Sequence, residues 1–174
     1  AGVLPEPARA AAFREGRLPQ GEKKVCVDVG GHTHIDTARL WRLCHTHEKC
    51  ARSFSTVNRL MTEYPEYIFL HTQPQQYDFI KHDYPEIFEQ IRRRAAQGRW
   101  EPAGGMWVEA DCNLPSGESL VRQLLYGTRF FESEFGNKST FLWLPDVFGY
   151  SAALPQILKQ SEIDTSLTTK ISWN

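Results

Sequence analysis

The sequence predicts an α/β protein with a parallel sheet and alternating helices. From Lys23 onward, short apolar runs typical of strands alternate with segments whose apolar residues recur every three or four positions. Alternation of this kind folds with right-handed crossovers into a parallel sheet. At 174 residues, with 41% hydrophobic and 24% charged residues, the chain can form one globular domain.

The elements are predicted in the following order. Residues 1–22 are rich in Ala, Pro, Arg and Gly and read as a linker or mobile tail, which leaves 23–174 for the domain. Strands are expected at 24–29, 67–70, 100–103, 140–144 and 166–169.

Four helices are expected between these strands, each with one apolar face. The first ends before Pro65, the second is capped by Asp83, the third is capped by Ser116, and the fourth spans 152–160. Their predicted buried positions are Phe54, Val57, Leu60, Met61 and Tyr64 in the first, Ile87, Phe88, Ile91 and Ala95 in the second, and Leu120, Val121, Leu124, Leu125, Phe131 and Phe135 in the third.

Composition argues against several classes of partner. Lys and Arg number 20 against 21 Asp and Glu, so the basic surplus that nucleic-acid binding needs is missing. No apolar run approaches the roughly 20 residues of a membrane span. Four cysteines without a Cys-x-x-Cys pair, and no signal-peptide core at the N-terminus, favour a reducing compartment. We therefore expect a cytoplasmic protein.

Candidate metal ligands follow two of the predicted strands. His34 and Asp36 come after the strand at 24–29, and Asp146 follows the strand at 140–144. The carboxyl ends of parallel strands meet at one edge, where ligands bind. Imidazole and carboxylate together suit Zn²⁺, with manganese or cobalt conceivable. Asp36 as a helix cap, and Asp146 as an N-terminal carboxylate of the helix near Ser151, are the structural alternatives.

Two other features bear on the site. The loop after Asp146 is rich in aromatic residues, and aromatic faces beside carboxylates are typical of sugar sites. Cys44, His45, His47 and Glu48 form a second metal-capable group, which we interpret as a solvated helix face because the two histidines point to different sides.

Three motifs resemble glycoside hydrolase family 38, the zinc-dependent α-mannosidases, in its bacterial and cytosolic branch. They are GHTHIDTA at 31–38, GGMWVEADCNLPSGES at 104–119 and WLPDVFGYS at 143–151. The similarity runs from about Val25 to Asn174 and ends on the family-like TKISWN.

The resemblance implies that the chain is the N-terminal part of a (β/α)7-barrel-like catalytic domain. Carried over by position, it makes His34, Asp36 and Asp146 ligands of Zn²⁺, Asp146 also the nucleophile of a retaining mechanism, and Phe148 part of the sugar pocket. The implied substrate is a terminal α-mannoside or oligosaccharide, whose 2- and 3-hydroxyls the zinc would grip.

The chain departs from the family pattern at several points. The fourth zinc ligand and the acid/base carboxyl are expected beyond residue 174, so these residues alone are expected to be inactive. A barrel cut after about five strands also leaves an edge that invites association, so a homo-oligomer is possible. Arg39 stands where the family usually has a Trp, and His45 where it often has a Glu.

Two alternatives remain open at this stage. His32 and His34 also mimic the His-x-His of amidohydrolase barrels, which would make His32 a ligand and Asp36 structural. The second alternative is a non-catalytic, mannose-binding or structural remnant, which Arg39 and the missing acid/base support.

Overall fold

The computed structural model describes residues 30–172. Its elements are β1 (Gly31–His32), α1 (Leu43–Glu63), β2 (Phe69–His71), α2 (Pro74–Asp83), α3 (Pro85–Ala96), β3 (Trp100–Pro102), α4 (Gly117–Phe135), β4 (Phe141–Trp143), α5 (Leu154–Gln160), β5 (Thr165–Leu167) and a 3-10 turn at Lys170–Ser172. The tail predicted at 1–22 and the strand predicted at 24–29 lie outside the described residues. Within them, β1 shows that strand pairing reaches His32, a position that the sequence placed beyond the strand.

All strand pairs among the described residues are parallel, which confirms the predicted fold class. β1, β2 and β3 form one sheet in that order, and β4 pairs with β5 in a second. The two sheets meet at Gly104, whose carbonyl accepts the backbone N–H of Trp143 at 3.2 Å. A Cβ at Gly104 would lie 2.6 Å from the Thr72 side chain, and its φ is +105°, so this junction requires glycine.

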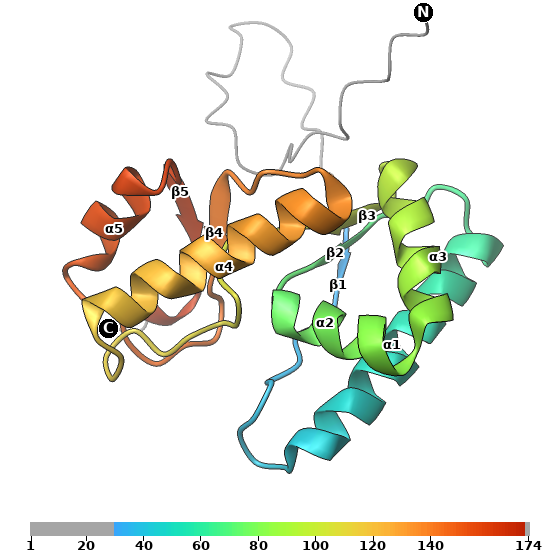
Figure 1. Cartoon of the computed structure of the whole chain (residues 1–174), viewed down its shortest axis with the longest axis horizontal. Helices are drawn as coiled ribbons and strands as arrows, with labels where there is room; N and C mark the ends of the chain where they lie inside the picture. The colour runs from blue at the N-terminus through green and yellow to red at the C-terminus, as the bar shows by residue number, and fades with distance from the viewer. Residues whose placement is uncertain (1–29, 173–174) are drawn as a thin grey trace, which may run out of the picture.

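The helices pack around the two sheets, as Figure 1 shows. α1, α2 and α3 lie beside β1–β3, α5 lies beside β4 and β5, and α4 crosses in front from one group to the other. Two apolar cores result. The larger contains Phe54, Phe69, Tyr77, Trp100 and Phe131, and the smaller contains Leu120, Leu124, Leu142, Leu144 and Leu158.

The region before α3 differs from the prediction. Asp83 does not cap α3, because it is the last residue of α2, a helix that the sequence analysis did not anticipate. Its carboxylate instead contacts the His47 imidazole, which stacks on Phe79 at a centroid distance of 3.8 Å. α2 was missed because it buries polar side chains such as Gln76, so its apolar periodicity is weak.

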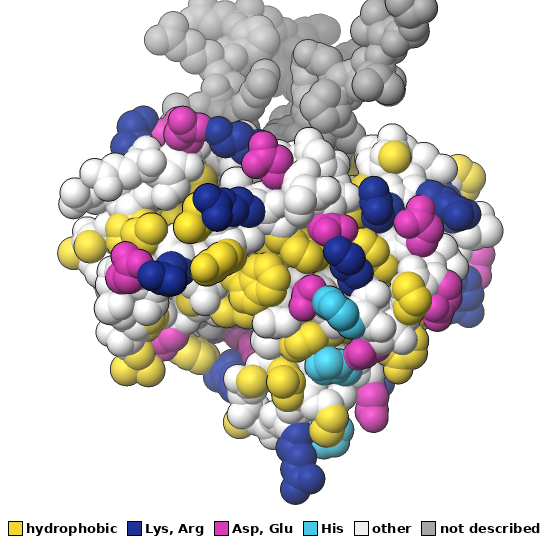
Figure 2. Space-filling model, in the orientation of Figure 1, with side chains coloured by type: hydrophobic (Ala, Val, Ile, Leu, Met, Phe, Trp, Pro, Cys, Tyr) yellow, Lys and Arg dark blue, Asp and Glu magenta, His cyan; other side chains and the backbone are white. Residues whose placement is uncertain are grey.

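Helix α4 begins and largely packs as predicted. Ser116 Oγ accepts the N–H of Ser119 at 3.3 Å, and Gly136 ends the helix at φ +65°. Val121 and Leu125, which were expected in the core, are 42% and 40% exposed. Figure 2 shows hydrophobic side chains over the middle of the face that α4 crosses. The apolar face of α4 is therefore wider than the core that it covers.

None of the helices within residues 30–172 combines the length and apolar character that a membrane crossing requires.

Candidate metal centre

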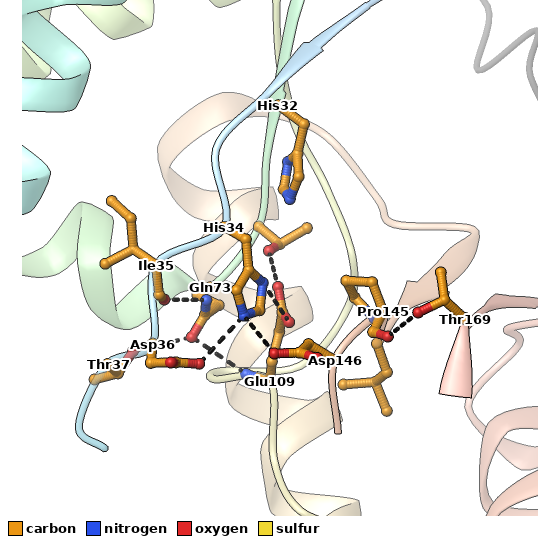
Figure 3. Close-up of polar contacts among 12 residues, drawn as sticks. His32, His34, Ile35, Asp36, Thr37, Gln73, Glu109, Pro145, Asp146 and Thr169 are labelled. Carbon is orange, nitrogen blue, oxygen red and sulfur yellow. Dashed lines mark hydrogen bonds and ion pairs between the residues drawn. The ribbon is translucent and has the colours of Figure 1, made fainter. Parts of the chain in front are cut away.

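Three of the predicted site residues lie close together. His34 and Asp36 are on the segment after β1, and Asp146 is on the segment after β4. Figure 3 shows the His34 ring between the carboxylates of Asp36 and Asp146. His34 Nε2 is 3.2 Å from Asp36 Oδ1 and 3.6 Å from Asp146 Oδ2. One donor atom from each residue lies within 4.8 Å of the other two, a spacing that suits a single metal ion.

The structure does not use Asp146 as a helix cap. α5 begins at Leu154, well after Asp146, and the hydroxyl of Ser151 accepts the N–H of Ala153 at 3.2 Å. Of the second metal-capable group, Cys44, His45 and Glu48 are exposed on α1, whereas His47 contacts Asp83 and Phe79.

Two cations face the carboxylates of this centre. Arg39 Nη1 is 3.7 Å from Asp36 Oδ2 and 3.6 Å from Asp146 Oδ2, and Lys170 Nζ is 2.7 Å from Asp146 Oδ1. The hydrogen bond from Lys170 is the main cause that lowers the pKa of Asp146, with His34 and Arg39 adding to it. Asp146 is therefore ionised at neutral pH, as a metal ligand or nucleophile must be.

Glu109 is a third acidic residue of the site, and the sequence analysis did not assign it. Its side chain is only 6% exposed, and Oε2 lies 3.3 Å from His34 Nδ1. This contact is the largest cause that raises the pKa of His34 to about 9, and Asp36 contributes as well. In the absence of an ion the imidazole is therefore protonated at neutral pH, and a metal ion must displace that proton.

An open cavity of about 480 Å³ lies over these groups, and His34, Asp36, Glu109, Asp146 and Phe148 line it. This volume is within the range of small-molecule sites. Phe148 is 62% exposed. Arg39 Cζ lies 4.6 Å and Lys170 Nζ 5.4 Å from the ring centroid, so cations already cover part of this aromatic surface.

Gln73 connects the segments around the cavity. It has φ +63°, an unfavourable backbone conformation for a residue with a Cβ. Its amide donates to the carbonyl of Ile35 at 2.9 Å, and Oε1 accepts the hydroxyl of Thr37 at 2.9 Å and the N–H of Glu109 at 3.4 Å. Hydrogen bonds to the segments after β1 and β3 therefore hold Gln73 in this strained conformation.

Two further histidines lie on the strands, His32 in β1 and His71 in β2. The ring of His32 donates from Nδ1 to the carbonyl of Leu70 at 3.0 Å, and its buried Nε2 has no hydrogen-bond partner among the described residues. His71 is fully buried, and this burial, followed by the charge of His32, lowers its pKa to about 3. His32, His34 and Glu109 form a second set of three donors within 4.8 Å of one another.

Sequence reasoning missed Glu109 and Lys170 for different reasons. Glu109 is separated from the end of β3 by a loop containing two glycines at positive φ, so the chain order gives no sign that it returns to the site. Lys170 follows β5, and its position after a strand was a usable signal.

The amino-acid sequence also matches known proteins. Residues 24–174 match the N-terminal domain of glycosyl hydrolases family 38. The chain is 53% identical over 153 residues to "Alpha-mannosidase G" of Dictyostelium discoideum, which covers 88% of this chain and 14% of that protein. It is 48% identical over 167 residues to "Alpha-mannosidase 2C1" of Homo sapiens, which covers 96% of this chain and 16% of that protein.

The fold also resembles a solved structure. The crystal structure of an alpha-mannosidase from Enterococcus faecalis superposes with a TM-score of 0.73 at 23% identity, covering 80% of this chain and 16% of that one. This likeness supports the fold alone. Taken together, the family match and the sequence relatives show that the chain belongs to glycosyl hydrolases family 38 and represents part of its N-terminal domain. The chain spans 14% and 16% of the length of these two relatives.

Proposed function

We propose that this chain supplies the nucleophile and three metal ligands for the hydrolysis of terminal α-mannosides with retention of configuration. The observation that carries the proposal is the convergence of His34, Asp36 and Asp146, from the segments after β1 and β4, at one cavity. Membership of family 38 supports the class of reaction.

The donor set fits a divalent cation. It combines one imidazole nitrogen with two carboxylates, and in the structure the cations Arg39 and Lys170 face those same carboxylates. Zn²⁺ accepts such a nitrogen and oxygen set. When bound, the ion would hold the 2- and 3-hydroxyls of a terminal mannose and offset negative charge at the site.

Asp146 is the proposed nucleophile. Its ionised carboxylate would attack the anomeric carbon and form a glycosyl ester, while the bond to the leaving oxygen breaks and an acid protonates that oxygen. The group that acted as the acid would then act as a base and take a proton from water. This water would attack the anomeric carbon and release Asp146. Two inversions at one carbon give net retention.

The reaction needs a second carboxyl about 5–5.5 Å from the nucleophile. We expect this acid/base group and a fourth metal ligand from parts of the family domain beyond the region matched here. Residues 1–174 by themselves are therefore expected not to turn over substrate.

Phe148 is proposed to contact the sugar. Its exposed ring lines the same cavity as the nucleophile, and an aromatic face suits the C–H surface of a pyranose. In the structure Arg39 lies over that ring, so a sugar could use the face only after the guanidinium moves aside.

The test uses the full-length protein, an aryl α-mannoside and NMR detection of the first anomer released. Wild type should release α-mannose first, and Asp146→Asn should lower turnover on the order of 10⁴-fold. Glu118→Gln, an exposed carboxylate on α4 paired with Arg122, is the matched control and should keep wild-type turnover. Release of β-mannose first, or near-normal turnover by Asp146→Asn, would contradict the mechanism.

An amidohydrolase-type site is the second candidate, favoured by the donor set of His32, His34 and Glu109. The two candidates make opposite predictions for bound zinc. Loss of the metal in His32→Ala but not in Asp36→Ala would support the amidohydrolase, and the reverse would support the mannosidase.

We also propose a cytoplasmic location, because the described cysteines Cys44, Cys50 and Cys112 are all free thiols, as expected in a reducing compartment. Fractionation of the source cells tests this proposal. A homo-oligomer and the lack of nucleic-acid binding stay predictions from the sequence.

A further inference from the structure

His34 presents its two ring nitrogens to different surroundings. Nε2 faces Asp36 and Asp146 at 3.2 and 3.6 Å, on the side of the proposed metal ion. Nδ1 faces Glu109 Oε2 at 3.3 Å. An imidazole that ligates a metal through Nε2 must carry its remaining proton on Nδ1, and that proton needs an acceptor.

The Glu109 carboxylate is suited to accept a hydrogen bond from this Nδ1 proton. Its side chain is 6% exposed, and Oε2 is buried with no partner among the described residues other than the His34 contact. The second oxygen, Oε1, accepts the hydroxyl of Thr72 at 2.9 Å. The carboxylate is therefore held by one oxygen and directed toward His34 by the other (Figure 3).

The backbone of Glu109 is also fixed. Its N–H donates to the side chain of Gln73, which in turn donates to the carbonyl of Ile35 on the segment that carries His34. Thr72 and Gln73 directly follow β2, so the end of β2 holds the segment after β3 against the segment after β1. This arrangement fixes the distance between Glu109 and His34.

We propose that Glu109 is a positioning residue that sets the orientation and tautomer of His34, so that Nε2 is offered to a divalent cation shared with Asp36 and Asp146. The inference deepens the proposed function and rests on it. Glu109 does not itself touch the cation in this assignment.

A different role for Glu109 follows if the ion lies between His32, His34 and Glu109. That set offers one carboxylate instead of two, and His32 does not line the cavity. Its Nδ1 already bonds the carbonyl of Leu70, and its ring packs against Trp143 at a centroid distance of 5.0 Å. The set containing Asp36 and Asp146 is open to a substrate, so we place the ion there.

The test measures the zinc affinity of the metal-free full-length protein by competition with a chromophoric chelator, and the visible absorption spectrum of the cobalt(II) form. Glu109→Gln keeps the shape of the side chain and removes its charge. It should weaken zinc binding by about 10- to 100-fold and shift the cobalt bands. Thr72→Val should change both in the same direction by less, because Glu109 loses one restraint. Glu118→Gln should leave both unchanged.

The outcomes separate this inference from the proposed function. If Asp36→Asn and Asp146→Asn lose the metal while Glu109→Gln keeps wild-type affinity and spectrum, the positioning role is refuted and the metal site stands. If both Asp variants keep the metal, the proposed function itself fails. If Glu109→Gln and His32→Gln lose the metal while the Asp variants keep it, Glu109 is a ligand and the assignment is overturned. Thr72→Val decides the question should Glu109→Gln fail to fold.

Discussion

Replacing Arg39 by glutamine should increase the affinity of the site for a divalent cation. The guanidinium lies 3.7 Å from Asp36 Oδ2 and 3.6 Å from Asp146 Oδ2, the two carboxylates that the ion would use. A bound ion would therefore be roughly 4–5 Å from a positive charge. It would also displace the arginine from the carboxylates that hold it.

The size of the expected change in zinc affinity follows from the exposure of the Arg39 side chain. Because Arg39 is 42% exposed, the effective dielectric constant is close to that of water. A unit charge opposing a divalent ion at this distance then costs about 2 kcal/mol, and somewhat less after salt screening. Arg39→Gln should accordingly tighten zinc binding by roughly 5- to 30-fold at low ionic strength.

Competition with a chelator, repeated at low and high salt, measures this change. Arg52→Gln, an exposed arginine on α1, is the control for net charge and should leave the affinity unchanged. Arg39→Trp should tighten metal binding similarly and also raise turnover of an aryl α-mannoside, because it adds an aromatic surface at the cavity. A zinc affinity of Arg39→Gln within twofold of wild type at low salt would refute the electrostatic reasoning.

Three further predictions concern the supports of the site. Gly127→Ala should lower the free energy of unfolding by about 3 kcal/mol, because the added Cβ would lie 2.8 Å from the backbone nitrogen of Trp107; unchanged urea unfolding would contradict this. Gln73→Gly should be more stable than Gln73→Ala by about 1 kcal/mol, since only glycine tolerates φ +63° without strain; equal thermal midpoints would exclude that strain. Burial holds the pKa of His71 at about 3 against 6.5 in the unfolded chain, so its contribution to stability is constant above pH 6.5 and is lost as the pH falls toward 3. His71→Gln should remove this loss of stability at low pH. If the free energy of unfolding in urea changes between pH 7 and 4 in the same way for variant and wild type, His71 is not the source of the loss.

The sequence predicted the parallel strands and the grouping of His34, Asp36 and Asp146, because both follow from local patterns. Apolar runs at 100–103 and 140–144 were recognisable, and so was the capping residue Ser116. The convergence of His34 and Asp146 could be expected because the carboxyl ends of parallel strands share an edge. Single residues at strand ends are therefore open to prediction once the strands are known.

Other parts of the molecule could not be predicted because they depend on tertiary contacts. α2 is held by buried polar groups, with Gln76 donating to the carbonyl of Ile35 at 2.6 Å, so its apolar periodicity is low. Asp83 could have served as a helix cap, but His47 on α1 binds it instead. Glu109 reaches His34 only because Gly104 and Gly105 turn the chain at positive φ. The spacing of residues along the sequence does not show whether a side chain binds a neighbouring residue or a distant one.

Glu109 and Arg39 act on opposite sides of the His34 ring. Glu109 lies on the buried side of His34 and favours the arrangement in which Nε2 is free to bind a cation. Arg39 lies on the open side and neutralises the carboxylates that would share that cation. Their effects on zinc affinity should therefore have opposite signs. The two free-energy changes need not add, because Arg39 and Glu109 are linked through Asp36 and His34 in one network of contacts. The double variant Arg39→Gln with Glu109→Gln should bind zinc with an affinity between those of the two single variants. An affinity outside that range would mean that Arg39 and Glu109 compete for the orientation of His34, and the separate roles assigned to them would have to be abandoned.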